Sequence, residues 1–193
     1  HILRDHNWVD VYTYDTLLKE ALRVSKGLAH LPHNSIIALP MPSESVLAIH
    51  TLGCFFAGHC ALPIDPTLST AQQLTLMKRY PIALCVYNEP NDTLTTSLNE
   101  HNIPHKCAQD IAKTTYFWDY PKHNTKDLPA IIFAHPEGNE VMLSQYNIIS
   151  HAQQLSIHCN TFGYDCVYNQ LGLHTPMGFH MGLMLPIVCG LSL

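Results

Sequence analysis

The sequence predicts an α/β domain with a largely parallel sheet and helices on both faces. Segments with apolar residues every three or four positions alternate along the chain with short, fully apolar segments. Strands separated by helices of this length need crossover connections, and such connections favour parallel strands covered on both sides. Hydrophobic residues make up 47% of the 193 residues and charged residues only 13%, which excludes an intrinsically disordered chain.

The elements of the first half follow from this alternation. Residues 14–29 have a helical period with Thr13 as the N-cap, Ser43 precedes a second helix, and Ser69 or Thr70 begins a third. A weaker helix is expected over 93–100. The strands expected between these helices cover 35–39, 60–64 and 82–87.

The second half begins at Pro129, after a polar stretch over 101–128 that we expect to be a surface connection. Ser144 is the expected cap of a helix over 145–159, and a loop is expected at 135–140. The remaining expected elements are strands at 130–134, 141–143 and 167–171 and a helix at 177–188. We treat residues 1–193 as one subdomain of a larger protein, divided into 1–100, 101–128 and 129–193; its first and last residues are those expected of an excised fragment.

Charge and cysteine content narrow the functional classes. The formal net charge of −5 argues against a nucleic-acid partner, because phosphates require a basic surface. Seven cysteines without any CxxC spacing favour reduced thiols in a cytoplasmic protein. Two uncharged stretches, 45–64 and 166–193, leave a membrane span as an alternative, but glycines and prolines favour a buried helix beside a buried strand, so no transmembrane segment is predicted.

Three classes of site are not supported by the residue pattern. His101, His105 and Cys107 are close in sequence, but Pro104 breaks the helix that would place them on one face, so no metal site is predicted. The sequence also lacks Gly-x-Ser-x-Gly, Gly-x-Gly-x-x-Gly and the phosphate-binding loop that ends in Lys-Ser/Thr. These absences argue against an α/β-hydrolase and a simple dinucleotide-binding domain.

Four segments resemble, in the same order, the start of adenylate-forming enzymes, which include acyl-CoA synthetases, luciferases, peptide-synthetase adenylation domains and fatty acyl-AMP ligases. They are 12–18, 34–43, 52–58 and 61–66, and residues 141–149 resemble the segment after the phosphate loop of these enzymes. The resemblance spans essentially the whole chain through its collinear order. It implies the N-terminal subdomain of that fold, with ATP and Mg²⁺ as cofactors only if the parent protein is active.

The same resemblance implies that this part of the protein lacks independent adenylation. The later acidic motif, the ribose-binding Asp and the small C-terminal domain with its catalytic Lys have no counterpart in the sequence. We therefore assign no catalytic residue. The expected partners are an acyl chain or lipid substrate and the remaining half of the protein's own ligase domain.

The interval that matches the family's phosphate loop departs from its pattern. It lacks Ser, Thr and Lys and is roughly three residues shorter than the family's loop, which needs several adjacent N–H donors. Pro136 removes one donor, and Glu137 and Glu140 add negative charge. His135 is either a functional substitute or a surface turn residue. The residues of this vestigial nucleotide loop are Phe133, Ala134, His135, Gly138, Asn139 and Ser144.

A second motif resembles the family's Leu-Pro-Leu-x-His followed by Met-Gly. Aligning Met177 and Gly178 puts Thr175 in the position of the family's His and His174 one place early. The resemblance implies that His174, Thr175, Met177 and Gly178 orient substrate or line an acyl channel. His174 and His180 could also be a pair of core histidines with satisfied ring nitrogens.

The Met-Gly pair is most similar to fatty acyl-AMP ligases, and the altered loop resembles the ligase-like domains of the disco-interacting protein 2 family. The resemblance implies a pseudoenzyme-like domain of a lipid-metabolism protein concerned with acyl or diacylglycerol-related lipid homeostasis. It would be cytoplasmic, with a peripheral position on organelle membranes as an extension of that expectation. The alternatives are a non-catalytic protein-interaction module on the same scaffold and an active adenylating enzyme with an unusual loop.

Overall fold

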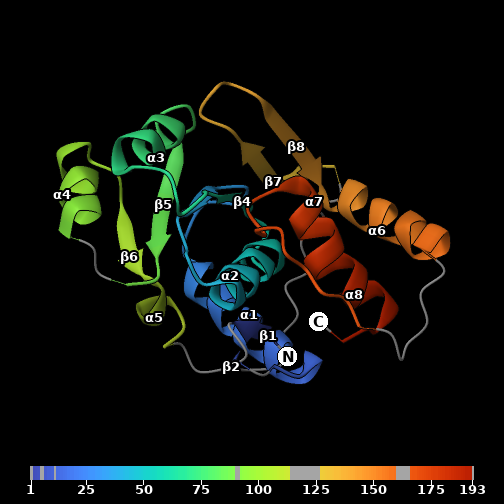
Figure 1. Cartoon of the computed structure of the whole chain (residues 1–193). Coiled ribbons are helices and arrows are strands. Elements are labelled where there is room, and N and C mark those ends of the chain that lie inside the picture. The colour runs from blue at the N-terminus through green and yellow to red at the C-terminus, as the bar shows by residue number, and fades with distance from the viewer. Residues whose placement is uncertain are drawn as a thin grey trace.

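The main sheet determines where the functional segments lie. In the computed structural model, which describes residues 2–4, 7–10, 12–89, 92–113, 127–159 and 166–192, six strands pair in the order β6-β5-β3-β4-β7-β8 (Figure 1). The strands from β6 to β7 are parallel, and β8 runs antiparallel to β7. The bounds are β3 (Ile36–Leu39), β4 (Cys60–Pro63), β5 (Ile82–Tyr87), β6 (His105–Cys107), β7 (Pro129–Ala134) and β8 (Glu140–Ser144), and a separate antiparallel pair joins β1 (Ile2–Arg4) to β2 (Asn7–Asp10).

The helices begin where the sequence places their caps. The side-chain oxygens of Thr13, Ser43 and Ser69 accept hydrogen bonds from N–H groups in the first turns of α1, α2 and α3, which confirms these predicted caps. The helices are α1 (Tyr14–Leu28), α2 (Glu44–Phe56), α3 (Thr70–Met77), α4 (Asp92–Glu100), α5 (Ala108–Ile111), α6 (Gln145–Cys159), α7 (Pro176–Phe179) and α8 (Leu185–Cys189), with the π-helical segment η1 (His180–Met184) between the last two.

Helices cover both faces of the sheet, as the apolar strands require. In β3, Ile37 and Leu39 pack into a core with α1, α2, α5, α6 and η1, whereas Ala38 between them packs into a second core with α3 and α4. In Figure 1, α4 and α6 lie at opposite ends of the molecule. The predicted fold class, a mostly parallel α/β sheet between two helical layers, is confirmed.

The sheet crosses the boundaries drawn in the sequence. Ala61 of β4 pairs with Ile131 of β7, so strands before and after the polar stretch 101–128 belong to one sheet. Within that stretch, β6 pairs with β5 and is followed by α5. Residues 114–126 of the predicted connection lie outside the described residues.

The strand predicted at 167–171 is wrong. This segment is irregular. The adjacent residue Cys166 forms an isolated β-bridge with Ser192. The Asn169 side chain supplies the alternative: its Oδ1 accepts from the Leu171 N–H over 3.2 Å, and its Nδ2 donates to the Leu171 carbonyl oxygen over 2.8 Å. Because one side chain binds both backbone groups of Leu171, these bonds compete with a strand ladder at that residue.

The helix predicted at 177–188 is confirmed in position but is not a continuous α-helix. It consists of α7, η1 and α8, and the Leu185 N–H bonds to the His180 carbonyl oxygen five residues earlier. Pro186 has no N–H and its ring would meet the preceding turn of an α-helix. A π-helical turn directly before the proline accommodates that ring.

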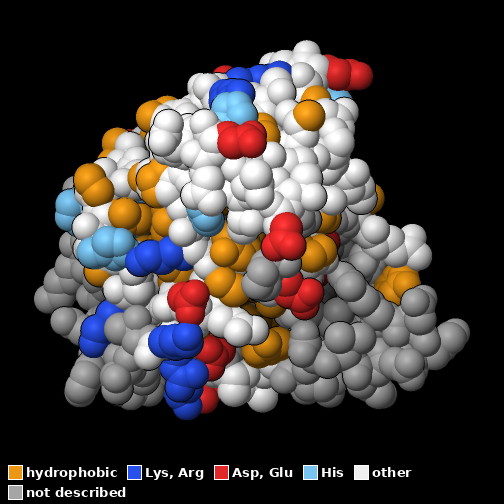
Figure 2. Space-filling model, turned by 90° about the vertical axis from the view of Figure 1, so that its left-hand side faces the viewer, with side chains coloured by type: hydrophobic (Ala, Val, Ile, Leu, Met, Phe, Trp, Pro, Cys, Tyr) orange, Lys and Arg blue, Asp and Glu red, His pale blue; other side chains and the backbone are white. Residues whose placement is uncertain are grey.

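Charged side chains of both signs lie among apolar ones on the face shown in Figure 2, leaving aside the residues drawn in grey. No continuous basic surface is visible on the described part of that face. Within the described residues, no helix has both the length and the apolarity needed to cross a bilayer.

Candidate functional site

A tight turn joins β7 to β8 where the sequence predicts the vestigial nucleotide loop. The turn consists of residues 135–139, because β8 begins at Glu140. The His135 N–H donates to the Asn139 carbonyl oxygen over 2.9 Å, and the Gly138 N–H donates to the His135 carbonyl oxygen over 3.0 Å. Gly138 has a φ of 102°, a conformation that favours glycine. The backbone of the turn is therefore closed on itself.

Pro136 and Glu137 add no free backbone donor to the turn. Pro136 has no N–H, and the Glu137 N–H donates to Nδ1 of His135 over 3.3 Å. The Glu137 side chain is 82% exposed, with its Oε2 3.9 Å from that same Nδ1. The turn therefore presents a carboxylate and an exposed imidazole to solvent, while the N–H groups of His135, Glu137 and Gly138 donate within it.

Two residues that follow α3 hold the turn from outside. The Arg79 guanidinium donates to the carbonyl oxygen of His135 over 2.8 Å and to that of Pro136. The Tyr80 hydroxyl donates to a carboxylate oxygen of Glu140. Burial, reinforced by this hydrogen bond and the charge of Glu140, raises the pKa of Tyr80 to about 12, so the phenol stays protonated at neutral pH. The end of α3 thus anchors both the turn and the first residue of β8.

A carboxylate and an imidazole meet beside this turn. Asp65 follows β4 and accepts hydrogen bonds from the Thr67 N–H over 2.8 Å and the Thr67 hydroxyl over 2.7 Å. Nε2 of His174 lies 3.6 Å from Oδ2 of Asp65. Burial opposes the charge of this carboxylate, but the Thr67 hydrogen bonds and the rings of His174 and His135 outweigh it and lower the pKa of Asp65. The structure thus brings His135 and His174 toward one anion.

Close backbone packing positions the predicted acyl-channel residues. The Thr175 hydroxyl donates to the Gly172 carbonyl oxygen over 2.9 Å and accepts from the Gly178 N–H over 3.1 Å, so it is the N-cap of α7. A Cβ atom on Gly178 would lie 2.2 Å from the Gly172 carbonyl oxygen, and one on Gly172 would lie 2.2 Å from Cε1 of His174. Both glycines are therefore needed for the fold of this segment and the place of the His174 ring.

A cavity of about 570 Å³ lies between α6 and the α7–η1 segment. Its volume is within the range of small-molecule sites, roughly 300–1,000 Å³. Met177 lines the cavity and is 59% exposed. The polar groups of the lining come mainly from α6. The lining residues are Leu143, Asn147, Ser150, His151, Gln154, Pro176, Met177 and His180.

His180 is the buried polar residue of this cavity. Its Nδ1 lies 2.9 Å from the Pro176 carbonyl oxygen and must carry the proton, which leaves Nε2 as an acceptor without a protein partner among the described residues. Its ring meets the ring of His151 edge to face with centroids 4.5 Å apart. Burial lowers the pKa of His180, the Pro176 carbonyl opposes this, and His151 adds to the lowering. The wall of the cavity therefore includes a neutral imidazole whose Nε2 is buried without a protein partner among the described residues.

Other residues of the predicted loop lie in the surrounding structure. Phe133 is buried in β7, with its ring centroid 5.6 Å from that of Phe179, and Ala134 ends the same strand half-buried. The Ser144 hydroxyl caps α6 by accepting from the Asn147 N–H over 3.2 Å, while the Asn147 side chain accepts from the Ser144 N–H. Of the predicted loop, the structure places His135, Gly138 and Asn139 in the turn, with Phe133, Ala134 and Ser144 flanking it.

Possible metal ligands are not clustered in the described residues, and three of the cysteines are buried in the core. Among these residues, no group of three or more His, Cys, Asp or Glu side chains could hold a metal ion. Burial raises the pKa of Cys54, and it raises the pKa of Cys60 and Cys85 to about 12. These three thiols are therefore protonated and packed in the core.

Solved structures of adenylate-forming enzymes match this fold. The chain superposes on the O-succinylbenzoate coenzyme A synthetase MenE from Bacillus subtilis, in complex with ATP and magnesium ion, with a TM-score of 0.79 over 94% of the chain and 50% of that protein. ATP-bound MatB from Rhodopseudomonas palustris gives 0.82 over 93% and 39%. The N-terminal domain of FACL13 from Mycobacterium tuberculosis gives 0.81 over 93% and 48%. The chain has the fold of the N-terminal subdomain of adenylate-forming enzymes.

The sequence similarity to these structures is low. The sequence identities are 14–15%, so the likeness concerns the fold, and the chain spans half or less of the length of these proteins. No protein-family model and no curated protein matches the sequence significantly. The closer assignment to the disco-interacting protein 2 family stays a prediction.

Proposed function

We propose that the chain is part of a fatty acyl-AMP ligase-like protein of lipid metabolism that binds an acyl chain or related lipid and does not adenylate it by itself. The observation that carries the proposal is the closed turn 135–139, which the sequence resemblance matches to the family's phosphate loop. The proposed location is the cytoplasm, including the periphery of organelle membranes. The other half of the ligase domain remains the expected partner.

The donor set of the turn fits a triphosphate poorly. Phosphate-binding loops present several adjacent N–H groups, often with a Lys and hydroxyl groups, to the phosphate oxygens. Here the N–H groups of His135, Glu137 and Gly138 already donate within the turn, and Pro136 has none. We therefore propose that this chain alone uses neither ATP nor Mg²⁺ as a cofactor.

Charge adds to this mismatch. Two like unit charges 4 Å apart repel by about 4 kcal/mol at the effective dielectric constant of a protein surface. Because the Glu137 side chain is 82% exposed, solvent would screen its repulsion of an incoming polyphosphate to well below this value. The Arg79 guanidinium already uses two of its five N–H donors on the carbonyl oxygens of His135 and Pro136.

The cavity between α6 and α7 supports the ligand half of the proposal. Leu143, Pro176 and Met177 supply apolar surface, and Met177 is a flexible side chain that adapts to apolar ligands. His180 contributes a neutral imidazole to the wall of the cavity, with its Nε2 buried. An acyl chain would therefore find apolar contacts in this cavity.

A protein-interaction module on the same scaffold is the second candidate, and one observation favours it. Apolar side chains are exposed on the edge strand β8 and on the adjoining α6. Their residues are between 45% and 54% exposed: Val141, Met142, Tyr146 and Ile149. An edge strand with exposed apolar side chains is a surface on which other chains or domains pack.

Two titrations of the protein test the proposal. Isothermal titration with MgATP should give no saturable heat at millimolar concentration, and a fluorescent fatty acid should bind saturably. Met177→Trp, which fills the cavity, should weaken fatty-acid binding about tenfold, since it removes apolar contact area from the ligand. Met142→Trp is the matched control, because Met142 is a similarly exposed methionine that does not line the cavity.

The outcomes separate the candidates. Saturable heat with MgATP would contradict the proposal and favour an active enzyme with an unusual turn. No fatty-acid binding, with no MgATP binding, would contradict the ligand half and favour the interaction module. Replacing residues 135–139 by a longer Thr/Gly-rich loop closed by Lys should create nucleotide affinity if the turn alone prevents it.

A further inference from the structure

The cavity between α6 and the α7–η1 segment, here called the acyl cavity, has two unlike walls. The opposite sides differ in polarity: Pro176 and Met177 of α7 form an apolar wall, and Leu143 of β8 adjoins it. The wall formed by α6 is polar. Its lining residues follow the first one at positions three, four and seven, so they share one helix face: Asn147, Ser150, His151 and Gln154.

Three side chains of this polar wall have hydrogen-bonding groups that are not used within the described part of the chain. Ser150, His151 and Gln154 make no side-chain hydrogen bond there. Asn147 is different, because its Oδ1 accepts from both the N–H and the hydroxyl of Ser144. A hydroxyl, an imidazole N–H and a carboxamide can each donate to a carboxylate oxygen. The polar wall therefore has donors to offer to a ligand.

His151 is both held against the cavity and open to water. Its ring meets the ring of His180 edge to face, with an angle of 82° between the ring planes and centroids 4.5 Å apart. His180 is only 4% exposed, whereas His151 is an exposed residue. The imidazole of His151 can therefore contact a ligand in the cavity and still take up a proton from solvent.

The groups around His151 leave the cavity without a fixed charge, since none of the lining residues is Asp, Glu, Lys or Arg. On β8, η1 and α8, which pack against α6, the titratable residues are Glu140, His180 and Cys189. The Glu140 carboxylate accepts the Tyr80 hydroxyl, and burial lowers the pKa of His180, so that ring stays neutral. Mild acidification therefore charges the cavity at His151. The titratable neighbours on α6 itself are Tyr146, His158 and Cys159.

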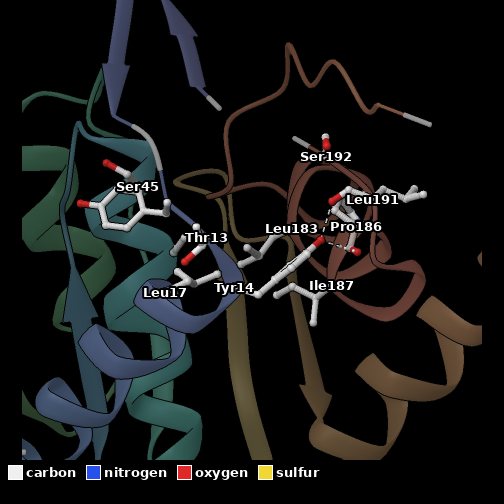
Figure 3. Close-up of a pocket in the computed structure, with 11 residues that line it drawn as sticks. Thr13, Tyr14, Leu17, Ser45, Leu183, Pro186, Ile187, Leu191 and Ser192 are labelled. Atoms are coloured by element: carbon white, nitrogen blue, oxygen red, sulfur yellow. Dashed lines mark hydrogen bonds between the residues drawn. The ribbon is translucent and has the colours of Figure 1, made fainter. Parts of the chain in front are cut away.

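A second cavity, of about 300 Å³, lies between α1, α2 and the η1–α8 segment, and most of its hydroxyl groups already have protein partners (Figure 3). Figure 3 shows Tyr14 extending from α1 toward α8, where its hydroxyl donates to the Pro186 carbonyl oxygen over 2.7 Å. The Thr13 hydroxyl caps α1, and that of Ser45 lies 3.1 Å from that of Ser43. The unused donors thus favour the acyl cavity as the place where a polar ligand end binds.

We propose that His151 binds the head group of a fatty acid in the acyl cavity. Its imidazole contacts the carboxylate, beside the hydroxyl of Ser150 and the carboxamide of Gln154, while the chain lies against Leu143 and Met177. A protonated ring attracts the carboxylate and a neutral ring does not, so the fatty acid binds more tightly at mildly acidic pH. This inference rests on the proposed function, since it assigns the polar end of the same ligand site.

Titration of the protein with octanoate and with 1-octanol, followed by NMR chemical shifts at about pH 6 and about pH 8, tests this role. The two pH values lie on either side of the ordinary pKa of imidazole, about 6.5, whereas a carboxylate stays ionised at both. We expect octanoate to bind about threefold more tightly at the lower pH, in keeping with the small contribution of exposed ion pairs. The uncharged 1-octanol should bind equally at both.

A variant of the ring and a matched control separate His151 from other histidines. His151→Gln keeps a donor and removes the titratable group, so the pH dependence of octanoate binding should disappear. His158→Gln should retain it, because His158 is an exposed histidine of the same helix that does not line the cavity.

The outcomes distinguish this inference from the proposed function. Saturable octanoate shifts beside Met177 that are the same at both pH values would overturn the role of His151 and leave the acyl cavity supported. An equal pH dependence for 1-octanol, or for His151→Gln and the unaltered protein, would overturn it in the same way. No saturable binding of either probe, or shifts confined to the amides around Tyr14 and Ile187, would overturn both this inference and the ligand half of the proposed function.

Discussion

Arg79 donates a hydrogen bond to the carbonyl oxygen of His135 over 2.8 Å, although the two residues are 56 positions apart. The contact joins the end of α3 to the turn between β7 and β8. Side chains that donate to backbone carbonyls restrict a turn without altering its own hydrogen bonds. The shape of this turn therefore depends on α3 as well as on its own residues.

Replacing Arg79 by alanine should loosen the turn and leave the fold intact. Hydrogen exchange at the His135 and Gly138 amides should accelerate several-fold, while the free energy of unfolding falls by about 1 kcal/mol or less, since exposed polar contacts contribute little. Arg23→Ala is the control, because Arg23 pairs with Glu20 on α1. Equal exchange rates at the turn in both variants would contradict the role of Arg79.

Replacing Gly178 by alanine should destabilise the protein. The new Cβ would lie 2.2 Å from a backbone oxygen of Gly172, and backbone cannot move aside cheaply. We expect a loss of about 1–3 kcal/mol in chemical unfolding, the usual range for overpacking. Gly182→Ala, whose Cβ would lie 2.0 Å from Nδ2 and 2.4 Å from Cγ of Asn169, would displace a side chain and its bonds to Leu171 rather than backbone, and should cost less. Equal losses would show that the contact with Gly172 can relax.

The buried histidines should make stability depend on pH. Burial lowers the pKa of both His50 and His180 below that of the unfolded chain, so the unfolded state binds more protons on acidification. Their neutral folded forms are fully favoured above a pH of about 6.5, and stability should fall as the pH decreases below that value. Urea midpoints between neutral and mildly acidic pH should show this decrease.

A variant of His180 tests its share of this dependence. His180→Gln keeps a donor for the Pro176 carbonyl and removes the titratable group, so the midpoint should change less with pH. The same substitution at the exposed His30 should reduce the slope less. A slope unchanged in His180→Gln would contradict the contribution of the buried ring.

Phe179 should be among the most sensitive core positions. Its side chain is buried, and its ring contacts Phe55 of α2 and Phe133 of β7, with centroids 6.2 Å and 5.6 Å away. Phe179→Ala should lower the free energy of unfolding by about 3–5 kcal/mol in urea titration. Phe179→Leu should lower it less, and similar losses for both would indicate that the ring contacts contribute little.

Much of the fold could be predicted because the signals are local. Caps such as Thr13 and Ser43 bind N–H groups three residues ahead, and fully apolar strands such as Ile82–Tyr87 are bounded by a proline or polar residues. The strand expected at 167–171 was wrong because its outcome depends on hydrogen bonds that one Asn169 side chain makes to Leu171. Apolar spacing does not reveal such competition.

The candidate site was only partly predictable for a related reason. His135, His174 and Gly178 came from motifs. Asp65 lies in the family-like segment 61–66 but was not predicted as a site residue, and Arg79 and Tyr80 belong to no motif. Arg79 and Tyr80 lie between a helix and Pro81, where the sequence indicates only a helix end. Asp65 occupies a turn between a strand and a helix. Their approach to the site depends on the packing of α3 and β4 against β7, which no local pattern specifies.

The register of the β7–β8 hairpin allows the turn between the two strands to change in length at a small cost in free energy. Pairing of Ala134 with Glu140 and of Phe133 with Val141 holds both strands regardless of what connects them. Extending the connection from five to eight residues would cost roughly 0.4 kcal/mol in closure entropy. Homologous proteins can therefore differ in the length of this turn through insertions and deletions, while the strands and helices around it stay the same.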